Sequence, residues 1–194
     1  SPAQLNKDHD VGLVIAAAGS SRRFGRGTNK LLSDLNGMPV ICYCLQTFLK
    51  VIDPHMVVIL VAPAAEDTFR SVFAHHGIPE SIIVTTGGRQ RQDSVYRGLC
   101  ALPNTVNIAV IQDGARPYSS VGILRACIAS ARERGSGIAA KRVVDTIKIA
   151  TPDGKVVSTP DRNKLWAVET PQVFKRDLIQ RCYQHVIDAG HHVT

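Results

Sequence analysis

Four basic side chains follow an apolar run near the start of the chain, in a loop rich in glycine and serine. The run covers residues 11–18, and the loop contributes Arg22, Arg23, Arg26 and Lys30. Glycine lets backbone N–H groups approach a ligand closely, and the cations attract a negatively charged ligand. The loop is therefore predicted to bind the phosphates of a nucleotide.

This loop differs from the two best-known glycine-rich phosphate loops. A Walker loop joins Gly-Lys directly to Ser or Thr, whereas Lys30 follows Asn29 and precedes Leu31. A dinucleotide fingerprint needs three glycines at fixed spacing, and Gly25 and Gly27 lack the third. The nucleotide is thus predicted to be held by side-chain cations. A solvated basic surface loop is the alternative that this segment leaves open.

Two further clusters follow later apolar runs. Gly88 and Ser94 provide a close backbone approach and a hydroxyl, which suit recognition of the edge of a base. Asp93 is better explained as a helix N-cap. Asp113 offers a hard carboxylate oxygen for Mg²⁺ between phosphates, and Arg116 offers a bidentate grip on a second phosphate. Alternatively, Asp113 and Arg116 only pair with each other.

These clusters must be positioned by strands and helices, and the sequence predicts that the two alternate. Continuous apolar runs are typical of strands buried on both faces, and segments with helical spacing separate them. The pattern predicts a mostly parallel sheet in an α/β, Rossmann-like three-layer fold, with the ligand at the carboxyl ends of the strands. Strands are expected within 11–18 and at 56–61, 81–86, 107–112 and 137–141, and helices at 39–49, 64–76, 92–102, 121–134 and 175–189.

Residues 142–168 break this alternation. Short β-prone pieces at 143–144 and 156–157 flank a Pro-Asp-Gly turn at 152–154, so a protruding β-arm is predicted. An isolated hairpin is only marginally stable, which favours packing against a partner subunit over a loose surface excursion. The chain, 1–194, is expected to form a single domain with this segment as its dimerisation arm.

Composition favours phosphorylated small molecules as partners. Lys and Arg number 23 against 16 Asp and Glu, a formal net charge of +7 that attracts anions. Aromatic residues make up only 5% of the chain and the cations are dispersed, so no nucleic acid partner is expected. The five cysteines show no metal-binding spacing and are expected to be free thiols. Without a membrane-length apolar stretch or a signal peptide, the protein is expected to be cytoplasmic, with no membrane partner.

Six short motifs occur in order along the chain. They are Ala-Ala-Gly-Ser-Ser-Arg-Arg-Phe with Lys30, Gly-Gly-x-x-Arg-x-x-Ser, Gln-Asp-Gly-Ala-Arg-Pro, Asp-Thr-Ile-Lys, Asp-Arg-Asn-x-Leu-Trp and Thr-Pro-Gln-Val-Phe. Together they resemble the 2-C-methyl-D-erythritol 4-phosphate cytidylyltransferase family, from about Gly12 to Thr194. The resemblance implies transfer of cytidylyl from CTP to methylerythritol phosphate, with release of pyrophosphate, in non-mevalonate isoprenoid biosynthesis.

The resemblance also implies roles for individual residues. Arg23 and Lys30 match two cations that stabilise the transition state at the α-phosphate, and Asp113 matches a residue near the Mg²⁺ cofactor and the ribose. A phosphate monoester is nearly dianionic at neutral pH, its second pKa being about 6, so the reaction needs no protein base. The residues matched to CTP binding are Ala17, Ala18, Gly19, Gly88 and Ser94.

Binding of the phosphorylated polyol is matched to three residues. Arg116 corresponds to a substrate-side contact, and Thr146 and Arg162, both in the arm, correspond to residues that reach the substrate of the neighbouring subunit. The resemblance therefore implies a homodimer. It also implies a further C-terminal segment with another substrate-side lysine, and that segment is expected to be missing from this sequence.

Two alternative functions remain at this point. A cytidylyltransferase for another polyol phosphate, such as ribitol 5-phosphate, would share the nucleotide loops. An inactive nucleotide-sensing or nucleic-acid-binding module is permitted by the positive charge, although it has little reason to keep both Lys30 and Asp113 beside the glycines.

Overall fold

A six-stranded sheet forms the centre of the protein in the computed structural model, which describes residues 7–18, 30–114 and 120–191. The strand order is β5-β4-β1-β6-β10-β7. Strands β5, β4, β1 and β6 are mutually parallel, whereas β10 runs antiparallel to both of its neighbours. The predicted mostly parallel α/β sheet is confirmed. The strands are β1 (Val11–Ala16), β4 (Val57–Val61), β5 (Ile83–Thr86), β6 (Ile108–Asp113), β7 (Ser136–Arg142) and β10 (Trp166–Lys175).

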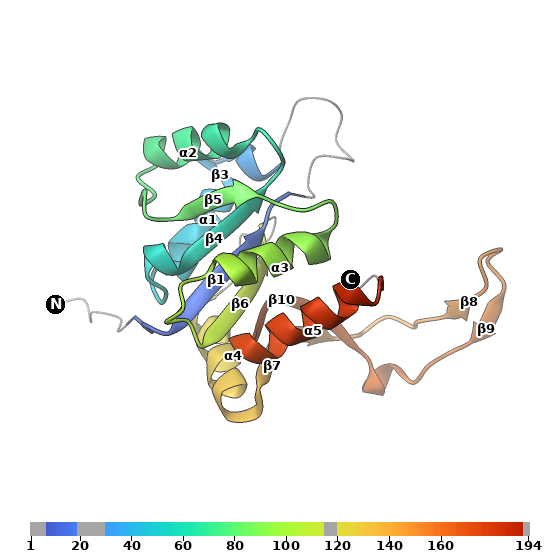
Figure 1. Ribbon diagram of the computed structural model, residues 1–194. Helices are drawn as coiled ribbons and strands as arrows, with labels where there is room; N and C mark the ends of the chain where they lie inside the picture. The colour runs from blue at the N-terminus through green and yellow to red at the C-terminus, as the bar shows by residue number, and fades with distance from the viewer. Residues whose placement is uncertain (1–6, 19–29, 115–119, 192–194) are drawn as a thin grey trace.

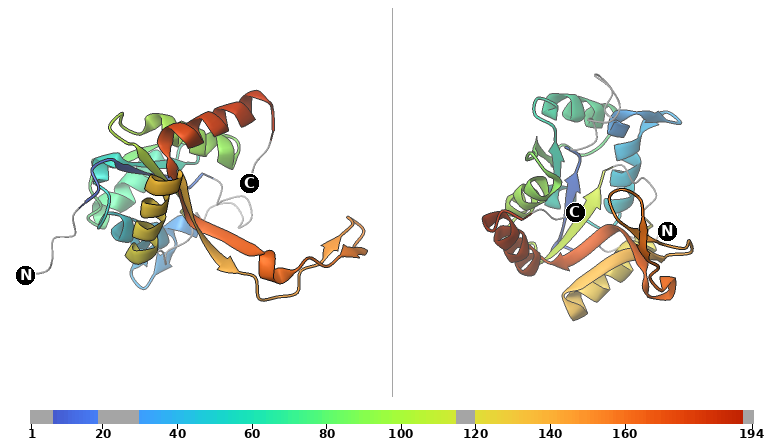
Figure 2. Two further views of the ribbon diagram at one scale, coloured as in Figure 1. Left: turned by 90° about the horizontal axis from the view of Figure 1, so that it is seen from below. Right: turned by 90° about the vertical axis from the view of Figure 1, so that its right-hand side faces the viewer.

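Helices cover both faces of the sheet, as the alternating pattern predicted. Figures 1 and 2 show α3 and α5 on one face and α1 and α4 on the other, while α2 packs beside the edge strand β5. In the described part of the chain, no helix is long and apolar enough to cross a membrane. The helices are α1 (Val40–Phe48), α2 (Glu66–His75), α3 (Arg91–Ala101), α4 (Val121–Arg134) and α5 (Arg176–Asp188).

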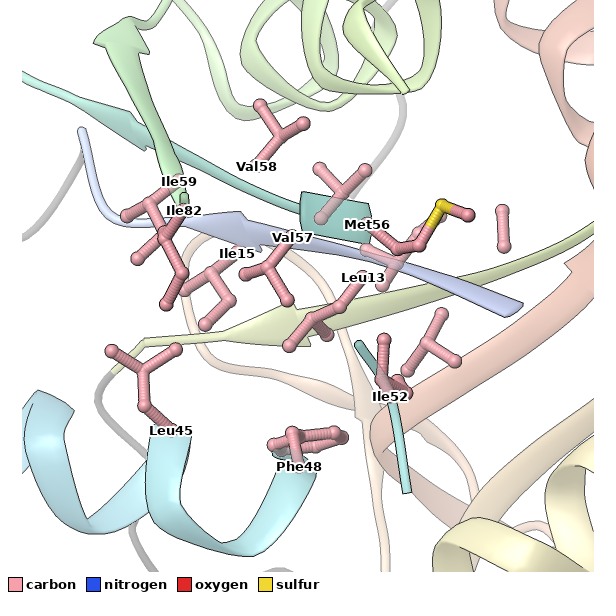
Figure 3. Packing of buried hydrophobic residues seen from close by; sticks show 14 of the residues in the cluster. Leu13, Ile15, Leu45, Phe48, Ile52, Met56, Val57, Val58, Ile59 and Ile82 are labelled. Atoms are coloured by element: carbon pink, nitrogen blue, oxygen red, sulfur yellow. The ribbon is translucent and has the colours of Figure 1, made fainter. Parts of the chain in front are cut away.

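The central strands form because their apolar side chains are buried on both faces. All five residues of β4 are buried, and β1 is buried up to its last residue. Figure 3 shows Leu45 and Phe48 of α1 facing the sheet near Leu13 and Ile15. Burial of such side chains contributes roughly 1.5–3 kcal/mol each and fixes the relative position of sheet and helix.

One strand of the sheet was not predicted. Trp166–Lys175 forms β10 between β6 and β7, whereas the sequence pattern placed residues up to 168 in the arm and none of 169–175 in a strand. Glu169 to Gln172 interrupt the apolar pattern, and the register with β7 shifts between Val168 and Gln172. Because polar residues and a proline occur at this irregularity, the sequence pattern does not predict a strand here.

The predicted arm at 142–168 is present and protrudes, but its base belongs to the central sheet. Trp166 on β10 pairs with Arg142 on β7. The sequence pattern predicted a hairpin isolated from the sheet, whereas the base of the hairpin is continuous with the sheet. Farther out, β8 (Ile149–Ala150) pairs with β9 (Val156–Ser158). Figures 1 and 2 show this part extending well away from the helices.

The predicted Pro-Asp-Gly turn closes the tip of the arm. The N–H of Gly154 donates to the carbonyl of Thr151 over 2.9 Å, and Gly154 has a φ of 87°. This left-handed conformation favours glycine, which explains why the turn could be located from the sequence.

The five cysteines are free thiols. Cys42, Cys44 and Cys127 are buried, and Cys100 and Cys182 are exposed. Burial raises the pKa of Cys42 to about 11 and that of Cys44 to about 12, so neither thiol ionises near neutral pH. Their role is packing, as the sequence predicted.

Candidate active site

The carboxyl ends of the parallel strands bring the predicted clusters to one edge of the sheet. Ala16 at the end of β1 pairs in register with Leu60 on one side and with Asp113 on the other. Val61 at the end of β4 pairs with Thr86 at the end of β5. The loops that follow β1 and β5 and the last residue of β6 therefore share this edge, where ligands of open α/β sheets bind.

The loop after β1 and the loop after β5 pack tightly against each other. A Cβ atom at Gly87 would lie 2.6 Å from the Cβ of Ala18 and 2.6 Å from Oγ of Ser94. The N–H of Ala17 donates to the carbonyl of Leu60 over 2.8 Å, which holds this loop beside β4. The structure thus brings Ala18 and Ser94 together around Gly87, which a larger residue could replace only if these neighbours moved, and Ala17 directly precedes Ala18 in the chain.

Ser94 orients the turn between β5 and α3. The N–H of Gly88 donates to Oγ of Ser94 over 2.9 Å, and that hydroxyl donates to the carbonyl of Gln90 over 3.2 Å. Ser94 is 2% exposed, so its hydroxyl is committed to this turn in the protein alone. Gly88 and Ser94, predicted as CTP-binding residues, are direct neighbours.

Asp93 caps helix α3, although not at the predicted position. Gln90 is the N-cap residue, and Asp93, in the first turn, accepts a hydrogen bond from the N–H of Gln90 over 3.1 Å. Both halves of a capping box are present. Asp93 therefore stabilises the start of the helix that carries Arg91 and Ser94.

Asp113 forms an ion pair that sequence analysis did not find. Nε and Nη2 of Arg91 each lie 3.1 Å from Oδ1 of Asp113. The alternative partner considered from the sequence, Arg116, lies outside the described residues. Arg91 belongs to the Gly-Gly-x-x-Arg-x-x-Ser motif, which was the available signal, but the motif does not show which side chain it contacts.

Lys30 begins a short 3-10 helix, Lys30–Leu32, and is exposed. Its neighbour Leu31 is 1% exposed. A Cβ at Gly114 would lie 3.1 Å from Cδ1 of Leu31 and 3.3 Å from Cγ2 of Ile15. Leu31 thus anchors the backbone of Lys30 next to Gly114, the residue that follows Asp113.

Three predicted site residues, Gly19, Arg23 and Arg116, lie outside the described residues. The same holds for Arg22 and Arg26 of the basic loop. Their proposed roles remain predictions.

The two predicted arm residues lie on opposite sides of the arm, Thr146 between β7 and β8 and Arg162 in the short 3-10 helix Arg162–Lys164. Nη1 of Arg162 donates to the carbonyl of Val144 over 2.9 Å, which links the two sides of the arm. Both side chains are exposed. Among the described residues, no hydrogen bond or ion pair connects either one to Lys30, Ser94 or Asp113.

At the carboxyl edge of the sheet, the described residues suit a magnesium ion that binds together with substrate phosphates. The described ranges contain no group of three or more His, Cys, Asp and Glu residues that would form a closed metal site. Mg²⁺ in nucleotide enzymes is commonly held by one or two carboxylates together with substrate phosphates and water. Asp113, whose side chain is 36% exposed at the strand end, suits an ion that arrives with a triphosphate.

Comparison with known proteins identifies relatives along nearly the whole chain. The profile of the 2-C-methyl-D-erythritol 4-phosphate cytidylyltransferase family matches residues 11–194. A protein of that name from Alkaliphilus oremlandii is 39% identical over 175 residues, which are 89% of this chain and 74% of the relative. Another of that name from Trichormus variabilis is 37% identical over 182 residues, 94% of this chain and 80% of the relative.

Solved structures of proteins with the same activity in their names share this fold. The crystal structure of 4-diphosphocytidyl-2C-methyl-D-erythritol synthase from Anaerococcus prevotii superimposes with a TM-score of 0.81 and 26% identity, and the match covers 96% of this chain and 80% of that one. The crystal structure of the cytidylyltransferase from Thermus thermophilus, 22% identical, shares the fold with a TM-score of 0.74 and coverage of 95% and 80%.

Proposed function

This chain belongs to the 2-C-methyl-D-erythritol 4-phosphate cytidylyltransferase family, and we propose how its residues divide the work of that reaction. The enzyme transfers the cytidylyl group of CTP to 2-C-methyl-D-erythritol 4-phosphate in non-mevalonate isoprenoid biosynthesis. Its substrates are CTP and a phosphorylated sugar alcohol. We also propose that it acts in the cytoplasm, which its free thiols support.

CTP is proposed to bind at the carboxyl edge of the sheet, with its base against Gly88 and Ser94 and its phosphates toward the loop after β1. The observation that carries this proposal is the contact between that loop and the turn before α3, which meet at Gly87, Ala18 and Ser94. Small residues there leave backbone N–H and C=O groups near the ligand, and such groups distinguish one base from another by hydrogen bonding. Gly19 is proposed to extend the same surface.

The chemistry is an in-line displacement at the α-phosphorus of CTP. An oxygen of the methylerythritol phosphate forms a bond to that phosphorus, and the bond between the phosphorus and the bridging oxygen of the β-phosphate breaks. Pyrophosphate leaves with the electron pair. Because the attacking monoester is nearly dianionic near neutral pH, alignment and charge neutralisation carry the catalysis.

Lys30 and Arg23 are proposed to neutralise charge that develops at the α-phosphate. Lys30 is supported by its exposed position and by Leu31, which fixes its backbone beside Gly114. A preorganised cation is effective because it needs no reorganisation when charge develops. Arg116 is proposed to contact the substrate phosphate.

Asp113 is proposed to contribute one oxygen to Mg²⁺ bound with the triphosphate. When bound, the ion neutralises phosphate charge and orients the leaving pyrophosphate. Asp113 itself supplies an anionic oxygen at a fixed position on β6.

We further propose that the enzyme is a homodimer in which the arm of each subunit completes the site of the other. The arm extends away from its own sheet edge, and its apolar side chains are exposed. A second copy would bury these side chains and bring Thr146 and Arg162 to a neighbouring site. The exposed apolar residues of the arm are Val144, Ile147, Ile149, Val156, Val157, Trp166 and Val168.

Pyrophosphate release with CTP and Mg²⁺ tests this proposal when methylerythritol 4-phosphate and ribitol 5-phosphate are offered separately. Turnover with the first substrate alone is expected. Turnover with ribitol 5-phosphate alone would contradict the substrate assignment. Binding of oligonucleotides with steep salt dependence, without turnover of either substrate, would contradict the enzymatic function.

A further inference from the structure

We propose that Arg91 is a positioning residue that orients the Asp113 carboxylate. The proposal rests on the proposed function in one respect, namely that Asp113 acts on the bound metal and nucleotide. Nothing in the sequence pattern linked these two residues, which come from α3 and β6.

The geometry of the Arg91 and Asp113 pair is directional. Nε and Nη2 of Arg91 both lie 3.1 Å from the same carboxylate oxygen, Oδ1. Two donors from one planar group restrict the rotation of the carboxylate more than one donor does. Both contacts fall on Oδ1, so Arg91 holds the carboxylate by one of its two oxygens.

The ion pair between Arg91 and Asp113 is better suited to orienting the carboxylate than to stabilising the folded protein. The side chains of Arg91 and Asp113 are 31% and 36% exposed. Ion pairs that are open to solvent contribute little to folding because water screens them. The backbone of Asp113 is already fixed by the pairing of β6 with β1, which leaves the side-chain torsions for Arg91 to control.

Tyr183 is a buried neighbour of this pair. Its side chain on α5 is 9% exposed, and both Arg91 and Asp113 influence the pKa of its phenol. Burial raises the pKa of Tyr183, the nearby Arg91 lowers it and Asp113 raises it, so the phenol stays protonated near neutral pH and can hydrogen-bond.

Helix α5 is itself fastened to α3 at both ends. Nε2 of Gln92, next to Arg91, donates to the carbonyl of His191 over 3.0 Å. At the other end, the guanidinium of Arg176 donates to the carbonyls of Leu99 and Leu102. The start of α3, which carries Arg91, is therefore held by the packing of the two helices.

A double-mutant cycle on the full-length enzyme tests the proposal. Arg91→Ala is expected to lower kcat by about tenfold or more, as is common when a supporting partner of a ligand-binding group is removed, and to change KM for CTP much less. In an Asp113→Asn background, the same change is expected to cost less than about twofold, because Arg91 then has no carboxylate to orient.

Matched variants separate positioning from general effects. Arg89→Ala removes the same charge two residues earlier, in the turn before α3, and its exposed side chain has no contact with Asp113 in the described residues, so near-normal kcat is expected. If Arg91→Ala does not fold, Arg91→Lys tests the same point, since it retains the charge without the two-nitrogen contact.

Three results would overturn the proposal. An equal loss from Arg91→Ala with and without Asp113→Asn would mean that Arg91 acts directly on the substrate or on the fold. Full activity of Arg91→Ala would remove its role altogether. Full activity of Asp113→Asn would mean that Asp113 has no catalytic role for Arg91 to support. Turnover by the wild-type enzyme in the same assay tests the overall reaction separately.

Discussion

The N–H of Gly88 donates to Oγ of Ser94 over 2.9 Å, and this bond joins the end of β5 to the first turn of α3. The two residues come from the same motif, and the bond explains their spacing. The short segment between them must turn back so that a helix begins directly at the ligand-binding edge.

Gly88→Ala is expected to impair both folding and CTP binding. A Cβ at this position would lie 2.2 Å from the Cβ of Asp93, which belongs to the rigid capping box, so the turn must open. We expect a loss of about 1–3 kcal/mol in the free energy of unfolding and a raised KM for CTP. Urea denaturation and steady-state kinetics measure the two effects.

Gly122→Ala is the matched control. A Cβ there would meet only Oγ of Ser120, at 3.9 Å, in the first turn of α4. Unchanged or slightly raised stability is expected, because alanine favours the helix. If both variants behaved alike, the close contact at Gly88 would not be the cause.

Lys30→Ala is expected to lower kcat by roughly a hundredfold or more without unfolding the protein, which is the usual effect of removing one preorganised transition-state donor. Lys50→Ala, also exposed, lies after α1 and should retain activity. Near-normal turnover of a folded Lys30→Ala enzyme would refute the assignment.

Arg176→Met is expected to destabilise the protein strongly, because it removes the attachment of α5 to the end of α3. The Arg176 guanidinium is buried and donates to the carbonyls of Leu99, Leu102, Pro103 and Val106, over 2.6–3.5 Å. Methionine fills similar space but leaves carbonyls without donors, which costs about 1–3 kcal/mol for each buried group. A thermal melt measures the loss, and an unchanged melting temperature would contradict this role.

Stability at acid pH is expected to depend on Asp10. The hydrogen bond from Arg132 is the main cause of the lowered pKa of this carboxyl, which both Nη1 and Nη2 of Arg132 contact, over 2.8 and 2.7 Å. A lowered pKa in the folded protein means that the stabilisation is present above the unfolded value, near 3.8, and is lost as the pH falls through the folded value. The difference in unfolding free energy between wild type and Arg132→Ala should therefore shrink below about pH 4. A constant difference down to pH 2 would contradict the linkage.

Much of the fold follows from local sequence patterns. The central strands are continuous apolar runs, and the turn at Gly154 has a characteristic glycine, so both could be predicted. Strand β10 was missed because its pairing with β6 and β7 depends on partners far away in sequence, while Thr170, Pro171 and Gln172 interrupt its pattern.

The site was less predictable than the fold. Motif spacing identified Gly88, Ser94 and Asp113 as candidate site residues. They share the carboxyl edge of the sheet because each lies at or just after the end of a parallel strand. The pairing of Asp113 with Arg91 depends on where the start of α3 lies relative to the end of β6, which no local pattern encodes.

The central claim, that each active site combines the sheet edge of one subunit with the arm of another, is tested most directly by mixing two inactive variants. Lys30→Ala damages the edge and Arg162→Ala damages the arm, so a hybrid dimer retains one intact site. After subunit exchange at equal concentrations, pyrophosphate release is expected to recover to roughly a quarter of the wild-type rate, since about half of the dimers are hybrids with one working site each. No recovery, with hybrid dimers demonstrated by native mass spectrometry, would contradict the shared site.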